Sequence, residues 1–117
     1  MQGVKSKNDL EERTFTFAQD VRRFVRALPR SLITIEDGSQ LVRSSGSVGA
    51  NYIEAQEALS KKDFGMRIKI CRKESKESRY WLKLLEGIPS SLENEHKRLI
   101  QESTELLKIF NAIVQKL

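Results

Sequence analysis

The 117-residue sequence predicts an all-α fold, an up-down-up-down four-helix bundle. Apolar residues recur at spacings of three and four along four long segments, and the links between these segments are short. No stretch shows the alternation of a half-buried strand. Only 2 Pro and 6 Gly, with 38% hydrophobic and 32% charged residues, are typical of a helix-rich globular protein. We therefore expect a flexible N-terminus at residues 1–8 and a single bundle over residues 9–117.

The first predicted helix spans residues 9–28. Asn8, with Glu11 three positions later, resembles a capping box, which marks a helix start. Pro29 ends the helix, because proline lacks a backbone N–H and its ring clashes with the preceding turn. The apolar stripe of this helix consists of Leu10, Phe17, Val21, Phe24 and Leu28. Three arginines lie largely outside the stripe and fit either a solvated face or an additional surface for a polyanion: Arg22, Arg23 and Arg26.

The second helix is predicted at residues 35–59. Thr34 is one candidate N-cap, but the following Asp37-Gly38 dipeptide is a turn signal, which would move the start to about Ser39. Both starts remain open at this stage. The apolar stripe has the same spacing as in the first helix, and consists of Leu41, Ser45, Val48, Tyr52, Ala55 and Leu59.

Small residues are concentrated in the middle of this second helix. Gly46 and Gly49 lie inside the helical pattern, where each glycine costs about 1 kcal/mol relative to alanine. A compensating contact is therefore required. We expect a neighbouring helix to approach closely at these positions.

The third and fourth helices are predicted at residues 61–86 and 91–116. Ser60 with Asp63 is a capping pattern that directly follows the second helix, so the link between them is very tight and makes an antiparallel αα-hairpin. Gly87 and Pro89 are the expected punctuation after the third helix. The fourth helix carries its own stripe: Leu92, His96, Leu99, Ser103, Leu106, Phe110, Ile113 and Leu117.

Apolar residues cover about half the circumference of the third helix, more than one bundle core needs. One part of this arc suits the core: Phe64, Ile68, Cys71, Leu82 and Leu85. The other part extends the arc, and we expect it to form a second buried surface between copies of the chain: Met66, Ile70, Trp81 and Leu84. The sequence thus predicts a homo-oligomer.

The opposite arc of the third helix is strongly basic. Between residues 61 and 83 there are nine Lys or Arg against three Asp or Glu, a net charge of +6, where the whole chain has +5. The residues of this arc are Lys62, Lys69, Arg72, Lys73, Lys76, Arg79 and Lys83. Such a stripe neutralises phosphates without reading bases, which predicts binding to an RNA or DNA backbone. The alternative is a helix face that only confers solubility.

Polar residues interrupt the apolar arcs of the second and third helices. We expect them to form a polar core between the two helices: Arg43, Asn51, Glu54, Glu74 and Glu77. Because the helices are antiparallel about Ser60, Asn51 should lie near Lys69, and Arg43 within reach of Glu74 or Glu77. Buried charges persist only when they are paired and hydrogen-bonded. Exposure of most of these residues at the bundle surface is the alternative.

No residue set suggests catalysis, a metal or a cofactor. His96 is the single histidine, so its Glu93-x-x-His96 spacing cannot form the paired motif of di-iron bundles. Cys71 is the single cysteine, reads as a core thiol and requires no oxidising compartment. No signal peptide or membrane span is recognisable. We therefore expect a cytoplasmic, non-enzymatic protein.

The ordered motifs RSSGSVGANYIEA at 43–55 and KKDFGMRIKICRKESKESRYWLKLLEGI at 61–88, after ALPRS at 27–31, resemble a known family. They are similar to small bacterial four-helix-bundle proteins related to the 23S ribosomal RNA intervening-sequence proteins. The resemblance covers residues 17–88, and Ala55 departs from the glycine that often follows the glutamate. Its most distinctive pieces are Leu28-Pro29, Arg43-Ser44, Asn51-Tyr52-x-Glu54 and Tyr80-Trp81-Leu82.

This resemblance implies a homo-oligomeric ring, typically a pentamer, without established enzymatic activity. A distantly similar branch is the accessory protein of diversity-generating retroelements, which contacts nucleic acid and a reverse transcriptase. Two functions therefore stand as hypotheses. One is an oligomer that binds a nucleic-acid backbone through the third helix, aided by the arginines of the first. The other is a scaffold that docks a protein partner, such as a reverse transcriptase.

Overall fold

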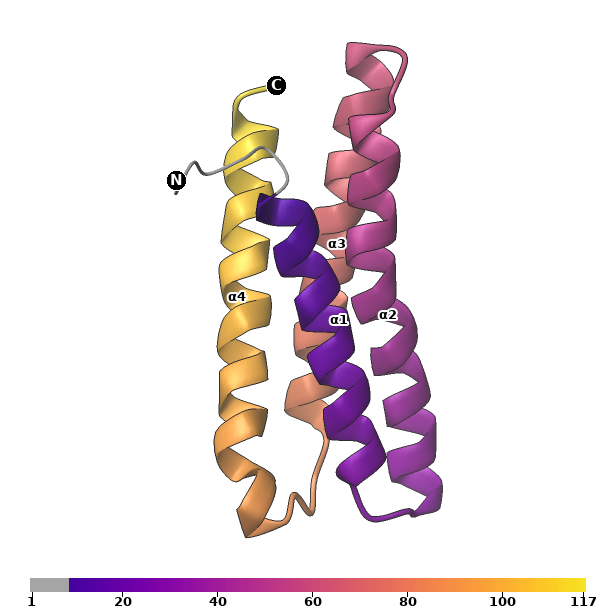
Figure 1. The fold of residues 1–117 in the computed structure, drawn as a ribbon, viewed down its shortest axis with the longest axis vertical. Coiled ribbons are helices and arrows are strands. Elements are labelled where there is room, and N and C mark those ends of the chain that lie inside the picture. Colours follow the sequence, from indigo (N-terminus) through magenta and orange to yellow (C-terminus); the bar gives the residue numbers. More distant parts are fainter. Residues whose placement is uncertain (1–8) are drawn as a thin grey trace.

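The fold consists of consecutive antiparallel helices, as Figure 1 shows. In a computed structural model that describes residues 9–117, the elements are α1 (Asp9–Ala27), α2 (Leu32–Gln56), α3 (Lys61–Leu84), the 3₁₀ turn η1 (Ser90–Leu92) and α4 (Glu93–Gln115). No strand occurs within this range. The all-α four-helix prediction is confirmed. The predicted cap at Asn8 lies outside the described residues.

One stripe of each helix forms the core. The fully buried large apolar side chains include Phe17, Phe24, Leu41, Ile68, Leu82, Leu99, Leu106 and Phe110. Burying a side chain of this size stabilises the fold by about 1.5–3 kcal/mol relative to leaving it exposed. The apolar periodicity therefore identified most of the core correctly.

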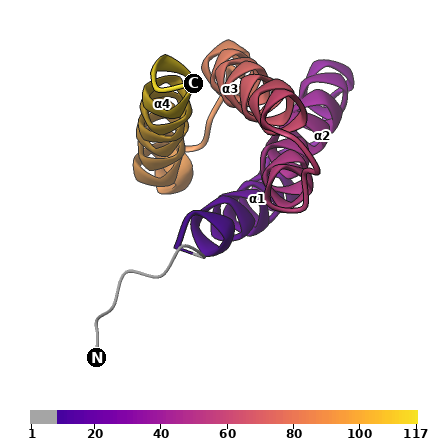
Figure 2. The same cartoon turned by 90° about the horizontal axis from the view of Figure 1, so that it is seen from above.

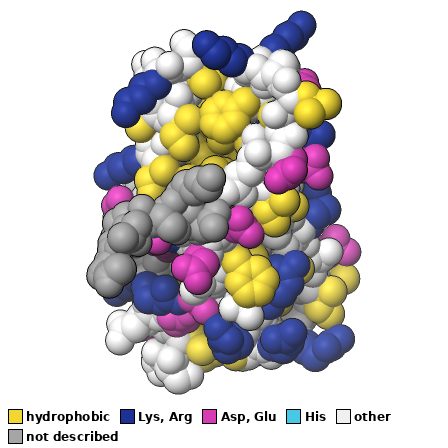
Figure 3. All heavy atoms as spheres, turned by 45° about the horizontal axis from the view of Figure 1, so that its top comes forward, with side chains coloured by type: hydrophobic (Ala, Val, Ile, Leu, Met, Phe, Trp, Pro, Cys, Tyr) yellow, Lys and Arg dark blue, Asp and Glu magenta, His cyan; other side chains and the backbone are white. Residues whose placement is uncertain are grey.

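Two residues predicted on apolar stripes are exposed instead. Leu59 is 96% exposed and Leu117 is 59% exposed. The reason is that α2 ends at Gln56 and α4 at Gln115, so both leucines lie beyond the regular helix. They border a surface hollow of about 730 Å³ near Phe64, at the end of the bundle that holds the α2–α3 turn. Figure 3 brings this end forward and shows hydrophobic side chains gathered there, with Lys and Arg around them.

Helix α2 begins earlier than either predicted start. Ser31 is the N-cap, and its Oγ accepts a hydrogen bond from the Thr34 N–H at 3.1 Å. Gly38 is therefore inside the helix and buried, because Val25 of α1 packs against it: a Cβ added at Gly38 would lie 3.1 Å from Val25 Cγ1. This packing overrides the local turn signal. The predicted cap of α3 is present, since Ser60 Oγ accepts from the Asp63 N–H at 3.0 Å.

The close approach expected at the glycines of α2 is made by α1. A Cβ at Gly49 would lie 3.0 Å from Thr14 Oγ1, and one at Gly46 would lie 3.1 Å from Arg22 Nη2. At Gly49 the next nearest atoms are the Cβ and a backbone carbon of Thr14, so α1 itself comes close there, whereas at Gly46 only the flexible end of Arg22 does. The contact therefore offsets the cost of glycine inside the helix.

Seen from above, the helices are arranged so that α1 and α3 lie at opposite corners, each packed on α2 and α4 (Figure 2). The α2–α3 seam is the most extensive and the α1–α4 seam the least. A groove of about 610 Å³ follows the α1–α4 seam. It is bridged by Arg13 with Glu102 (Nε–Oε2 2.7 Å) and Arg98 with Asp20 (Nη2–Oδ2 2.8 Å). Within residues 9–117, none of the helices combines the length with the uninterrupted apolar character that a membrane span requires.

Candidate nucleic-acid interface

The basic face of α3 runs along the whole helix. Its members are Lys62, Lys69, Arg72, Lys73, Lys76, Arg79 and Lys83. The five lysines are exposed, and the two arginines are half-buried. Four of the lysines recur every seven residues, a period at which an α-helix drifts only about 20°. They therefore form one line about 32 Å long at 1.5 Å per residue.

Most charges on the basic face have no anionic partner. Lys73 Nζ lies 3.8 Å from Glu74 Oε2, and Arg72 Nη1 donates to Asn111 Oδ1 of α4 at 3.1 Å. Within residues 9–117, no ion pair joins the other five members to a carboxylate: Lys62, Lys69, Lys76, Arg79 and Lys83. The face therefore presents uncompensated positive charge to solvent.

The arginines of α1, which the sequence indicated as an additional surface for a polyanion, lie apart from the basic face of α3 within one chain. Arg22 is half-buried and its Nη1 donates to the Ala18 carbonyl at 3.2 Å, whereas Arg23 pairs with Asp20 at 2.7 Å. Arg26 is exposed. Because α1 lies diagonally across the bundle from α3, within one chain these side chains belong to a separate surface.

The apolar extension of α3 lies beside the basic face. Met66 is 53% exposed and Leu84 is 41% exposed, while Ile70 and Trp81 are half-buried. The Trp81 indole Nε1 donates to Glu77 Oε2 at 3.2 Å. The single chain thus leaves much of this apolar surface in contact with solvent.

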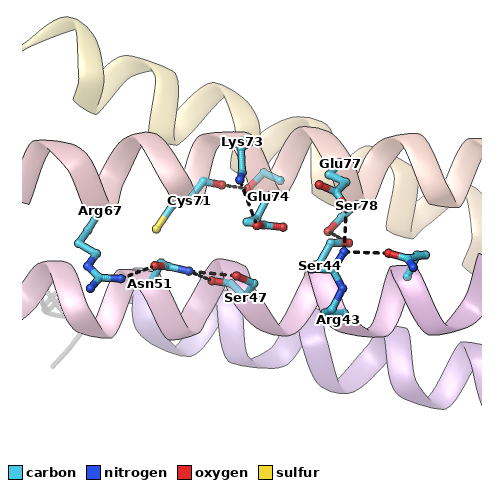
Figure 4. Close-up of polar contacts among 12 residues, drawn as sticks. Arg43, Ser44, Ser47, Asn51, Arg67, Cys71, Lys73, Glu74, Glu77 and Ser78 are labelled. Atoms are coloured by element: carbon cyan, nitrogen blue, oxygen red, sulfur yellow. Dashed lines mark hydrogen bonds and ion pairs between the residues drawn. The ribbon is translucent and has the colours of Figure 1, made fainter.

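Members of the predicted polar core follow the α2–α3 seam (Figure 4), but their burial differs: Glu74 is buried, Asn51 and Glu77 are half-buried, and Arg43 and Glu54 are exposed. Arg43 Nη2 is 3.5 Å from Glu77 Oε2 and donates to Gln40 Oε1 at 2.8 Å, so Arg43 is within reach of a glutamate as expected. The Arg43 side chain is nevertheless 63% exposed, and Glu54 is exposed as well. Both residues lie outside the core of the chain, because they occupy the outward side of α2.

Asn51 contacts a different residue from the one predicted. Its Oδ1 accepts from Arg67 Nη1 at 2.9 Å, and its Nδ2 donates to the Ser47 carbonyl at 2.9 Å and to Ser47 Oγ at 3.0 Å. The predicted neighbour Lys69 is exposed on the basic face. Pairing residues of α2 and α3 that are equally far from Ser60 predicts approximately which turns of the two helices lie together. It does not predict which side chain of that α3 turn faces α2.

Two further polar features of this seam were missed or only partly predicted. The Ser44 and Ser78 hydroxyls, both fully buried, lie 2.9 Å apart. The sequence indicated this contact only by placing a serine on the inward side of each helix. Glu74 is 7% exposed, and its Oε1 is buried without a hydrogen-bond partner among the described residues. Burial raises the pKa of Glu74, as does the neighbouring charge of Glu77, while Lys73 and Arg43 lower it.

The single cysteine and histidine have structural contacts. Cys71 is buried, its Sγ donates to the Val48 carbonyl at 3.4 Å, and burial raises the pKa of the thiol to about 12. A neutral thiol is a poor nucleophile. His96 stacks on Phe24 at 5.6 Å between ring centroids, and its Nε2 lies 2.6 Å from the Leu82 carbonyl near the end of α3. No group of three metal-binding side chains occurs within residues 9–117.

Comparisons with known proteins agree on one family. The family model described as 23S rRNA-intervening sequence protein matches residues 6–112. The chain is also similar to the crystal structure of a protein of unknown function from the S23 ribosomal protein family of Bacteroides thetaiotaomicron. That similarity has a TM-score of 0.80 and 30% sequence identity, and covers 92% of this chain and 96% of the other. Comparison with curated proteins gives no match.

Proposed function

Since the chain belongs to the family of 23S rRNA-intervening sequence proteins, we propose that it is a non-enzymatic protein that binds RNA or DNA through the phosphate backbone. The basic face of α3 is the binding surface. The observation that supports this most directly is the line of exposed lysines without carboxylate partners. Their charge attracts a polyanion, and no carboxylate in the described range 9–117 forms an ion pair with it.

Backbone contacts by lysine carry no sequence information, because sequence is read from base edges in the grooves. Binding is therefore similar for unrelated sequences of equal length. It weakens steeply with salt, because each neutralised phosphate releases condensed counterions.

We further propose that the protein works as a homo-oligomer, a pentameric ring, whose subunits meet through Met66, Ile70, Trp81 and Leu84. The exposed apolar surface beside the basic face supports this assembly. A ring places several basic faces on one particle, so linked binding events raise the overall affinity. Molar mass in solution tests the assembly, and a monomer at micromolar concentration would contradict it.

The binding proposal is tested by fluorescence anisotropy of labelled RNA and DNA over a salt titration. The triple variant Lys69→Gln/Lys76→Gln/Lys83→Gln is compared with Lys97→Gln/Lys108→Gln/Lys116→Gln, which removes the same charge from exposed positions in and just after α4. Loss of about three phosphate contacts should reduce the salt slope by about 2–3 in the first variant only. Equal effects of both variants would show that net charge alone matters, and no binding at low salt would refute the proposal.

The second candidate function is a scaffold that docks a protein partner, such as a reverse transcriptase. The exposed side chains of Met66, Tyr80 and Leu84 favour it, because aromatic residues and methionine are enriched at protein interfaces. In that case the apolar surface carries affinity and the charge only steers association. Substituting the lysines would then change the association rate and leave dissociation unaffected.

A further inference from the structure

One exposed aromatic side chain lies within the line of lysines. Tyr80 is 57% exposed. Residues three and four apart are neighbours on a helix surface, so Tyr80 has Lys76 on one side and Lys83 on the other. The Tyr80 ring is therefore not part of the apolar core of the bundle.

The Tyr80 ring is held in place by a chain of contacts that leads back to α2. Its centroid lies 5.0 Å from that of Trp81, with the ring planes at 77°. Trp81 Nε1 donates to Glu77 Oε2 at 3.2 Å, and the same oxygen lies 3.5 Å from Arg43 Nη2. An edge-to-face pair is worth about 0.5–1.5 kcal/mol beyond burial, so it favours one orientation of the ring while more than half of Tyr80 remains exposed. Tyr80 is therefore an ordered, accessible π-surface rather than a loose side chain.

Lysines bind the phosphates of single and double strands alike, but an aromatic face is useful only for a base that has left its stack. Proteins that bind single strands combine a cationic track with aromatic side chains on which bases stack. On the basis of the proposed function, we propose that Tyr80 is a stacking platform for an unpaired base. The ligand class is then single-stranded RNA or DNA, or an unpaired loop, in preference to a duplex.

The test compares four 12-nucleotide probes: single-stranded RNA, single-stranded DNA, the DNA duplex, and an abasic single strand. Substitution of Tyr80→Leu should weaken binding of both base-bearing single strands about 5- to 150-fold, the range that one lost stacking contact gives. The duplex and the abasic strand should bind as before. Tyr80→Phe retains the ring and should behave as the wild type. Comparison of RNA with DNA assigns the ligand as one or both.

A second readout uses Trp81, the single tryptophan of the chain. A base stacked on Tyr80 lies next to this indole, so the single strands should quench its fluorescence and the abasic strand should not. Circular dichroism verifies that the variants fold. An equal loss for all four probes on Tyr80→Leu, or unchanged affinity for single strands, would overturn the stacking proposal alone. If the wild type binds none of the probes, the proposed function itself fails.

Discussion

Arg67 of α3 donates a hydrogen bond to Asn51 of α2 at 2.9 Å, and Asn51 in turn donates to Ser47. All three residues are half-buried, so the contact lies where water competes only in part. Hydrogen bonds to charged groups stabilise a protein by about 1.5–3 kcal/mol.

Replacing Asn51→Ala should therefore lower the free energy of unfolding by about 1.5–3 kcal/mol, because Arg67 would lose its partner. Urea unfolding measures the change. Gln19→Ala is the control, since Gln19 is exposed on α1. A cost for Asn51→Ala no greater than that of the control would show that Arg67 is equally well solvated without it.

The buried hydroxyl pair of Ser44 and Ser78 permits a double-mutant cycle. Either single substitution to alanine leaves one hydroxyl with fewer partners, although Ser44 Oγ also contacts the Leu41 carbonyl at 3.3 Å. Removing both hydroxyls should cost less than the sum of the single effects, by about 0.5–1.5 kcal/mol. Additive losses in denaturant midpoints would argue against a hydrogen bond between the two side chains.

Two glycines should respond to alanine in opposite directions. At Gly49 the new Cβ would meet Thr14, including its Cβ at 3.4 Å, so α1 must move and the protein should lose about 1–3 kcal/mol. At Gly65 the new Cβ would meet only the end of the Leu117 side chain, at 3.2 Å. Leu117 is exposed and can rotate away. The higher helix propensity of alanine should therefore outweigh the contact and raise the free energy of unfolding by up to about 1 kcal/mol. Thermal unfolding compares the pair, and a loss at both positions would contradict this account.

Glu74 should make stability depend on pH. Its folded-state pKa lies above the unfolded value, so the folded chain holds the proton more tightly. The stability it contributes is present in acid and is lost as the pH rises through the folded pKa. Glu74→Gln remains neutral, so its free energy of unfolding should rise relative to that of the wild type between pH 4 and pH 7.

Glu86→Gln is the matched control for that pH series, because it makes the same change at an exposed position. The measurement is the urea midpoint across the pH range. Greater stability of the wild type at neutral pH would indicate that the contact with Lys73 outweighs burial.

Local patterns predicted the elements better than the contacts between them. The apolar stripes and the Ser60 cap depend on residues close in the sequence, and both are present. The start of α2 depends on Val25 packing against Gly38, which no local pattern contains. The partner of Asn51 depends on which face of α3 each side chain occupies: Arg67 faces α2, whereas Lys69 faces solvent.

The candidate site divides in the same way. The spacing of the lysines defined the basic face, because helical geometry alone aligns them. Within residues 9–117, the lack of carboxylate partners for every lysine of this face except Lys73 depends on how the helices pack. The position of the α1 arginines across the bundle depends on the same packing. The contact between Tyr80 and Trp81 depends on side-chain rotamers, which the spacing does not specify.

The uneven seams give the bundle a preferred order of opening. The α2–α3 hairpin has a four-residue link at 57–60 and the most extensive seam, so its contacts are local and form at a low cost in chain entropy. The α1–α4 edge joins distant parts of the chain, has the smallest seam, and includes two ion pairs near the surface that salt weakens. Transient opening should therefore separate the outer helices first, and amide hydrogens of α1 and α4 should exchange faster than those of α3. Helix α3, which carries the lysines, would stay folded while α1 and α4 separate transiently.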